Sequence, residues 1–248
     1  MIYQSFAQFY DDLFDEHLYQ EWANYVEKHR SENTKQVLDL AGGAGRLGVL
    51  LAQKGYSVCD LDFSEDMLTL AQAHADASQV PLKLVCADMT DLKGLGQYDL
   101  VTCFADSLNY LENIDQVTES MQQVYQHLRI GGKFLFDMIT PYQTDVVYPG
   151  YMYNYEDPDG QRAFMWSSYQ YDDVPHGVIH DLTFFYRQNN GLYRRGTETH
   201  FERAYGLASV TQAVQSAGFN KPVITSDFGQ HPISDKTTRW FFECQKVD

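Results

Sequence analysis

Short apolar runs alternate with amphipathic segments along the first 140 residues of the chain. The runs predict five strands, at residues 37–40, 57–61, 82–86, 99–104 and 133–138. Between them, apolar residues recur at helical spacing, so a helix is predicted between each strand and the next. Runs with few polar residues are typical of parallel strands that are covered on both faces. The pattern therefore predicts an α/β fold with a doubly wound parallel sheet.

Residues 141–202 follow a different pattern. The segment is crowded with aromatic residues and is divided by turn signals such as Asp157-Pro158-Asp159-Gly160 and Asn189-Asn190-Gly191. Apolar and polar residues alternate between these turns, which predicts antiparallel hairpins. We expect an inserted antiparallel β lid, a substrate subdomain lying over the mouth of the active site. The main domain is then expected to comprise residues 1–140 and 203–248, closed by a helix at 207–217 and strands at 222–228 and 238–246.

The first predicted strand ends in a glycine-rich turn. Gly42, Gly43 and Gly45 fall within four residues, which lets the backbone approach a ligand closely. The helix that follows presents free N–H groups to polar or anionic ligand groups. Dinucleotides and S-adenosylmethionine (SAM) are the two ligand classes that use such a turn.

Two acids near this turn bear on the choice of ligand. Gly43-x-Gly45-x-x-Gly48 matches the dinucleotide fingerprint, and Asp62 lies at the expected distance of about 20 residues. Asp39, at the end of the strand, favours SAM. Its carboxylate repels a pyrophosphate but attracts an ammonium or a sulfonium.

The order of these motifs resembles that of class I (Rossmann-like) SAM-dependent methyltransferases, and more narrowly the small bacterial methyltransferases called YqeM-like. In their first motif an acid is followed by alternate glycines, and here Ala41 replaces the first glycine. Their second motif, an acid before a capped helix, is matched by Asp62 and Ser64. The resemblance implies a seven-stranded, mostly parallel sheet whose last strand is antiparallel.

The resemblance also implies roles for individual residues around the cofactor. Asp62 is expected to bind the ribose hydroxyls, in preference to Asp60 one pleat earlier, and Asp88 and Met89 to meet the adenine. An N-terminal helix within residues 1–30 is expected to cover the cofactor, with packing against the core as the alternative. The whole expected cofactor site is Tyr10, Asp39, Ala41, Gly42, Gly43, Gly45, Asp62, Phe63, Met67, Asp88, Met89 and Phe104.

Polar residues after the fourth predicted strand are the candidates for the acceptor side. Asp106 and Asn109 follow that strand at the switch point where open sheets bind ligands. With His200 from the insert they form the predicted catalytic set, although Asp106 is also suited to cap the next helix. The histidines of the insert match no standard ligand spacing, so no metal site is predicted.

The net charge and the cysteines limit which partners and which cellular compartment we expect. The net charge of −16 disfavours nucleic acid as a partner, because an acidic chain repels phosphates. We expect no membrane partner and no signal peptide. The four cysteines lie in predicted strands without C-x-x-C spacing, so we expect them to be buried and reduced, in the cytoplasm. The oligomeric state stays open between monomer and homodimer.

A methyltransferase that moves a methyl group from SAM to a nitrogen or oxygen of a small molecule fits these observations best. Direct displacement from an activated donor needs mainly alignment and exclusion of water, and no nucleophilic triad is apparent in the chain. An RNA or protein methyltransferase is the alternative, as is a SAM-binding regulator without turnover. An NAD-dependent oxidoreductase is the least favoured interpretation.

Overall fold

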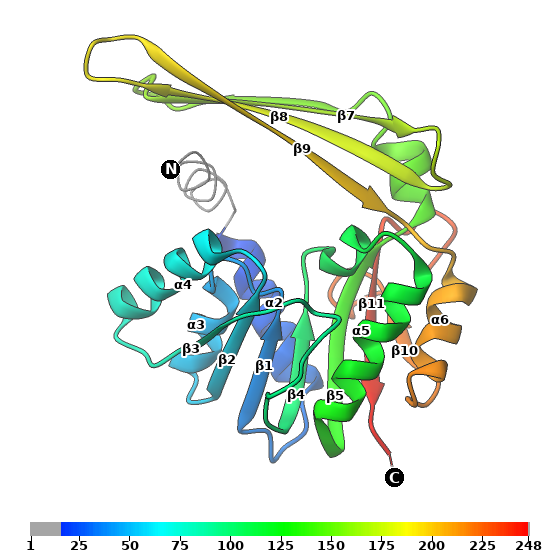
Figure 1. The fold of residues 1–248 in the computed structure, drawn as a ribbon. Helices are drawn as coiled ribbons and strands as arrows, with labels where there is room; N and C mark the ends of the chain where they lie inside the picture. Colours follow the sequence, from blue (N-terminus) through cyan, green and yellow to red (C-terminus); the bar gives the residue numbers. More distant parts are fainter. Residues whose placement is uncertain (1–15, 248) are drawn as a thin grey trace.

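The computed structural model describes residues 16–247, which form two β-sheets and the helices around the larger one. The larger sheet has seven strands in the order β10-β11-β5-β4-β1-β2-β3. β11 pairs antiparallel with both β10 and β5, whereas the other neighbouring strands pair in parallel. This confirms the mostly parallel sheet with an antiparallel last strand (Figure 1). Its strands are β1 (Gln36–Leu40), β2 (Ser57–Asp62), β3 (Lys83–Cys86), β4 (Tyr98–Cys103), β5 (Leu128–Ile139), β10 (Val223–Thr225) and β11 (Arg239–Gln245).

Helices cover both faces of this sheet because its strands are apolar on both sides. Alternate residues such as Leu38 and Phe136 pack against one pair of helices, and their neighbours Val37 and Leu135 pack against another. The first pair is α5 (Ile114–His127) and α6 (Leu207–Ser216), and the second is α2 (Glu16–His29) and α3 (Arg46–Gln53). None of the helices in residues 16–247 is long and apolar enough to cross a membrane.

Local sequence signals set several helix boundaries. Ser64 caps α4 (Glu65–Ser78), because its Oγ accepts a hydrogen bond from the N–H of Met67 at 3.3 Å. Asn113 caps α5 in the same way, through the N–H of Gln116 at 2.9 Å. These helices lie where the apolar spacing predicted them.

Two sequence predictions in the main domain were wrong. Residues 87–97, between β3 and β4, contain no helix. Side chains there bind the backbone two residues on, Asp88 the N–H of Thr90 and Asp91 that of Lys93, and such turns compete with helix formation. β5 begins at Leu128, five residues before the predicted strand at 133–138, so Gly131 lies inside a strand.

The insert forms an antiparallel sheet of four strands in the order β6-β7-β8-β9. They are β6 (Met152–Glu156), β7 (Arg162–Tyr171), β8 (Gly177–Arg187) and β9 (Tyr193–Arg203), joined at the turns that the sequence predicted. A π-helical turn, η2 (Gln143–Val147), leads from β5 into this sheet. Figure 1 shows the four-stranded sheet above the edge at which the parallel strands end.

Candidate functional site

Buried polar residues form a row on the α3 face of the larger sheet. Asp39 on β1 is in register with Asp60 on β2 and with Thr102 on β4. All three are almost completely buried, and Asp62 and Asp137 lie on the same face, nearer the carboxyl edge. Because buried carboxyls are costly without partners, the row marks this edge of the sheet as a place for ligands.

Asp39 has one satisfied and one unsatisfied oxygen. Its Oδ1 accepts a hydrogen bond from Thr102 Oγ1 at 2.7 Å, whereas Oδ2 is buried and has no hydrogen-bond partner in the described part of the chain. Burial, opposed by the Thr102 hydrogen bond, raises the pKa of Asp39 to about 7. An incoming cation or N–H donor would satisfy the free oxygen.

The glycines of the turn are needed for different structural reasons. A Cβ on Gly42 would stand 2.5 Å from Asp60 Oδ1, and one on Gly45 would stand 2.7 Å from the Cβ of Ala71 in α4. A Cβ on Gly43 would meet no described residue within 4 Å, and the φ of Gly43 is +59°. Gly42 and Gly45 are therefore required by packing, and Gly43 is the glycine open to a ligand.

Asp62 and Asp60 occupy different environments, although both come from β2. Asp62 Oδ2 accepts a hydrogen bond from the N–H of Gly43 and Oδ1 one from the N–H of Ser64, each at 2.9 Å. Phe63, next to Asp62, is 77% exposed. Asp60 is fully buried, and within residues 16–247 neither of its oxygens has a hydrogen-bond partner, so burial raises its pKa well above the ordinary value. Asp62 is thus the carboxyl at the open edge.

The other residues expected around the cofactor lie along the same edge. Asp88 is exposed, and its Oδ1 accepts hydrogen bonds from both the N–H and the hydroxyl of Thr90. Met89 packs against the core cluster beneath α5. Phe104, 5% exposed, stacks on Trp22 of α2 with ring centroids 6.0 Å apart. Tyr10 lies outside the described residues.

The cysteines follow the sequence prediction in three cases of four. Cys59, Cys103 and Cys244 are buried free thiols, but Cys86 is exposed. Cys86 is the last residue of β3, an edge strand that is only partly covered, which explains the difference.

The segment after β4 has an unusual backbone. Ala105 and Asp106 both have positive φ, of 57° and 56°. Two consecutive residues with side chains in the left-handed region are strained, and such strain clusters at functional sites. The N–H of Asp106 donates to Asp137 Oδ1 at 2.8 Å, which holds this conformation. The side chain of Asp106 caps no helix, so the capping alternative finds no support here.

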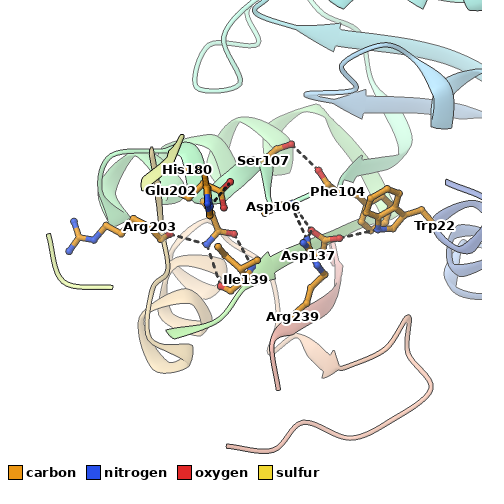
Figure 2. Close-up of polar contacts among 11 residues, drawn as sticks. Trp22, Phe104, Asp106, Ser107, Asp137, Ile139, His180, Glu202, Arg203 and Arg239 are labelled. Carbon is orange, nitrogen blue, oxygen red and sulfur yellow. Dashed lines mark hydrogen bonds and ion pairs between the residues drawn. The ribbon is translucent and has the colours of Figure 1, made fainter. Parts of the chain in front are cut away.

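Arg239 joins two carboxylates that come from distant parts of the chain. Its Nη1 lies 3.0 Å from Asp106 Oδ1 and 2.8 Å from Asp137 Oδ1. Trp22 Nε1 donates to the other oxygen of Asp137 at 3.0 Å (Figure 2). Burial raises the pKa of Asp137, and the guanidinium of Arg239 opposes that rise. Neither Arg239 nor Asp137 was among the residues predicted from the sequence.

The side-chain amide of Asn109 is fully engaged in hydrogen bonds with backbone groups. Its amide nitrogen donates to the carbonyls of Ile139 at 3.3 Å and Arg203 at 2.9 Å, and its Oδ1 accepts from the N–H of Ile139 at 3.0 Å. Asn109 is 1% exposed and belongs to the 3-10 turn η1 (Ser107–Tyr110). It therefore ties the end of β5 to the end of β9.

Residues of the four-stranded sheet contact the 3-10 turn η1. His200 Nδ1 lies 3.2 Å from the hydroxyl of Tyr110, and His200 Nε2 lies 3.2 Å from Glu198 Oε2. Glu202, which the sequence did not single out, and His180, one of the histidines of the insert for which no metal site was predicted, are both buried and face the same region (Figure 2). Burial, and next the charge of Asp106, raise the pKa of Glu202 well above its ordinary value. In the sequence, the only signal for Glu202 was an acidic residue at an inward-facing position of a strand.

Comparison with known proteins is consistent with this geometry. Residues 37–132 match the family model described as a methyltransferase domain. The chain is 36% identical to GWCH70_2453 of Geobacillus sp. (strain WCH70), covering 99% of this chain and 100% of that protein. It is 35% identical to YqeM of Bacillus subtilis (strain 168), covering 99% and 98%. Both relatives are provisionally named as methyltransferases.

A solved structure shares the fold over its whole length. The S-adenosylmethionine-dependent methyltransferase from Clostridium acetobutylicum ATCC 824 superposes with a TM-score of 0.86 at 27% identity. The superposition covers 99% of both chains, so the four-stranded sheet is part of the shared architecture.

Proposed function

Because this chain belongs to the SAM-dependent methyltransferase family, we propose that it methylates a nitrogen or oxygen of a small molecule held beneath the four-stranded sheet. The supporting observation is that β8 and β9 present polar groups that are buried between the two sheets. Glu202 and His180 are 7% and 3% exposed, although both are polar. Buried polar groups of this kind suit a small acceptor better than a nucleic acid, which the net charge of −16 also disfavours.

The residues present fit SAM. The unpartnered Oδ2 of Asp39 suits the ammonium of the methionyl end, and the open Gly43 lets a ligand approach the backbone. We assign the ribose to Asp62 and the adenine side to Phe63, Asp88 and Met89. SAM, when bound, supplies a methyl group already activated on a sulfonium. The protein then has to align the acceptor and exclude water.

On the acceptor side, we assign the direct contacts to Asp106 and His200. Asp106 stands at the end of β4 in a conformation fixed by Asp137, and its carboxylate is held by Arg239. His200 reaches the same region from β9 through Tyr110. An acceptor amine must lose a proton before or during transfer, and either group is placed to receive it. Asn109 has its amide engaged by backbone, so we assign it a positioning role.

We also place the enzyme in the cytoplasm. The buried free thiols of Cys59, Cys103 and Cys244 support a reducing compartment.

The test is transfer of labelled methyl from SAM to three kinds of acceptor: a panel of small amines and alcohols, total RNA, and protein extract. We expect S-adenosylhomocysteine to form with small acceptors, and Asp106→Asn and His200→Gln to lower kcat by about 100-fold, the usual contribution of acid–base groups. Asp91→Asn, at an exposed position, is the matched control. Label found only in RNA or protein would overturn the small-molecule assignment. S-adenosylhomocysteine binding without turnover on any acceptor would indicate a regulator.

A further inference from the structure

His180 and Glu202 project from the same face of the four-stranded sheet. His180 pairs with His200 across β8 and β9, and Glu202 pairs with Val178, so the two side chains are diagonal neighbours. Their side chains are 4% and 6% exposed. Figure 2 draws both residues together with Asp106, whose charge acts on each of them.

The hydrogen bonds of His180 fix its tautomer. Trp166 Nε1 lies 3.2 Å from His180 Nδ1, and an indole N–H can only donate. Nδ1 is therefore the acceptor, which also sets the Ser168 hydroxyl, 2.7 Å away, as a donor. Burial lowers the pKa of His180 to about 4, so the ring is neutral near pH 7 and carries its one proton on Nε2.

This Nε2–H has no hydrogen-bond acceptor in the described structure. Nε2 is a buried atom without a partner, and Glu202 Oε1 lies 3.7 Å from it, beyond hydrogen-bond distance. His180 cannot serve as a base through Nε2, because that atom already holds a proton. It is a fixed donor.

Glu202 supplies the complementary group. Its Oε2 is buried and has no hydrogen-bond partner among residues 16–247. Interaction with Asp106 is among the causes that raise the pKa of Glu202, so the proton of the carboxyl faces Asp106 and Oε2 is left as an acceptor. An unmet donor and an unmet acceptor thus lie side by side in a region where polar groups are normally satisfied. The group that completes both must accept from His180 and donate to Glu202. A hydroxyl does both, whereas an ammonium cannot accept and an ether cannot donate.

We propose that His180 and Glu202 form a subsite that binds a hydroxyl of the methyl acceptor, next to the atom that is methylated. This inference rests on the proposed function and narrows its acceptor class to hydroxylated molecules. The subsite fixes the orientation of the acceptor, and His180 and Glu202 act as positioning residues.

The test compares two probes that differ only in a hydroxyl, trans-2-aminocyclohexanol and cyclohexylamine. Each is titrated into the protein saturated with S-adenosylhomocysteine, with affinity measured by calorimetry and the His180 Nε2–H followed by 15N NMR. We expect the hydroxylated probe to bind about tenfold more tightly, as one buried hydrogen-bonded group contributes. We also expect it alone to shift the Nε2 resonance.

Variants separate the two hydrogen bonds from the fold. His180→Phe and Glu202→Leu should abolish the preference for the hydroxyl. His180→Gln and Glu202→Gln keep a polar group at each place and should retain much of it. Asp91→Asn, at an exposed position away from the four-stranded sheet, is the control and should change nothing. Should His180→Phe not fold, Glu202→Leu and the NMR titration carry the test.

Equal affinity for the two probes, or an Nε2 resonance that neither probe shifts, would overturn the proposal and leave only a bound water as the occupant. Failure of the proposed function would give a different experimental result. In that case S-adenosylhomocysteine itself would not bind, or no methyl transfer to any small acceptor would occur.

Discussion

The carboxyl of Asp60 lies directly against the backbone of Gly42. A Cβ on Gly42 would stand 2.5 Å from Asp60 Oδ1 and 2.7 Å from both the Cγ and Oδ2 of Asp60. Asp60 is fully buried and pairs in register with Asp39, so it has no room to move aside. The glycine-rich turn is thus shaped by the strand beneath it as well as by the ligand above it.

Gly42→Ala should destabilise the fold for this reason. Overpacking of a buried contact costs about 1–3 kcal/mol, measurable as a fall in the free energy of unfolding in urea. Gly48→Ala is the graded comparison, because its Cβ would stand 3.1 Å from Asp60 Oδ2. Adding Asp60→Ala to Gly42→Ala should recover part of the loss. A double variant as unstable as the sum of the two single variants would show that Asp60 is not the obstacle.

Binding of S-adenosylhomocysteine should weaken as the pH falls below 7. The pKa of Asp39 is raised to about 7 without ligand, so the carboxylate that attracts the ammonium must first lose a proton at lower pH. Where binding requires this deprotonation, Kd rises by about tenfold per pH unit on the acidic side. Calorimetry from acidic to mildly alkaline pH checks it. Asp39→Asn should bind weakly at every pH, and Asp91→Asn should follow the wild type.

Arg239→Met should be strongly destabilising. The substitution leaves the buried Asp137 without its cation and Asp106 without its ion pair, and removal of one partner of a buried pair costs about 3–5 kcal/mol. Arg239→Lys keeps a charge within reach and should lose less. Adding Asp137→Asn to Arg239→Met should recover part of the stability, since the amide needs no counter-charge. Arg195→Met, at an exposed position of β9, is the neutral comparison in thermal unfolding.

Asn109→Ala should loosen the four-stranded sheet at its base. It removes three hydrogen bonds to backbone and leaves the buried N–H of Ile139 unsatisfied, a loss of about 2–4 kcal/mol in all. Hydrogen exchange should accelerate at the end of β9 more than in β1. Asn109→Asp keeps the acceptor for Ile139 but turns a carboxylate oxygen toward two buried carbonyls, so it should be at least as destabilising as Asn109→Ala. Unchanged exchange in β9 would mean that other contacts hold the two sheets together.

The sequence was most informative where function depends on neighbouring residues. Asp39, Gly43 and Asp62 lie in a strand-turn-helix unit whose apolar pattern and turn residues are visible locally, and the structure brings them together at one edge. The predicted helix between β3 and β4 failed because Asp88 and Asp91 form turns through their own side chains. Propensity alone did not reveal that competition.

The acceptor side was less predictable because its contacts are distant in sequence. Arg239 meets Asp106 across 133 positions, and Glu202 reaches Asp106 only because the insert folds back over η1. Asp137 interrupts the apolar run of β5, but its partners Trp22 and Arg239 come from opposite ends of the chain. Pattern along the chain identifies such a residue without identifying what it binds.

The four-stranded sheet is attached to the main domain near one end, so it can pivot about that end. Its base is fixed where Asn109 holds Arg203 and where the Tyr205 hydroxyl donates to the carbonyl of Leu111 at 2.5 Å. From there β9 extends for 11 residues, about 35 Å at the rise of a strand, to the turn at Asn190. A rotation of a few degrees at the base therefore displaces the far turn by several ångströms while Glu202, beside the pivot, hardly moves. Access for an acceptor can thus be opened at the tip without disturbing the groups that orient it.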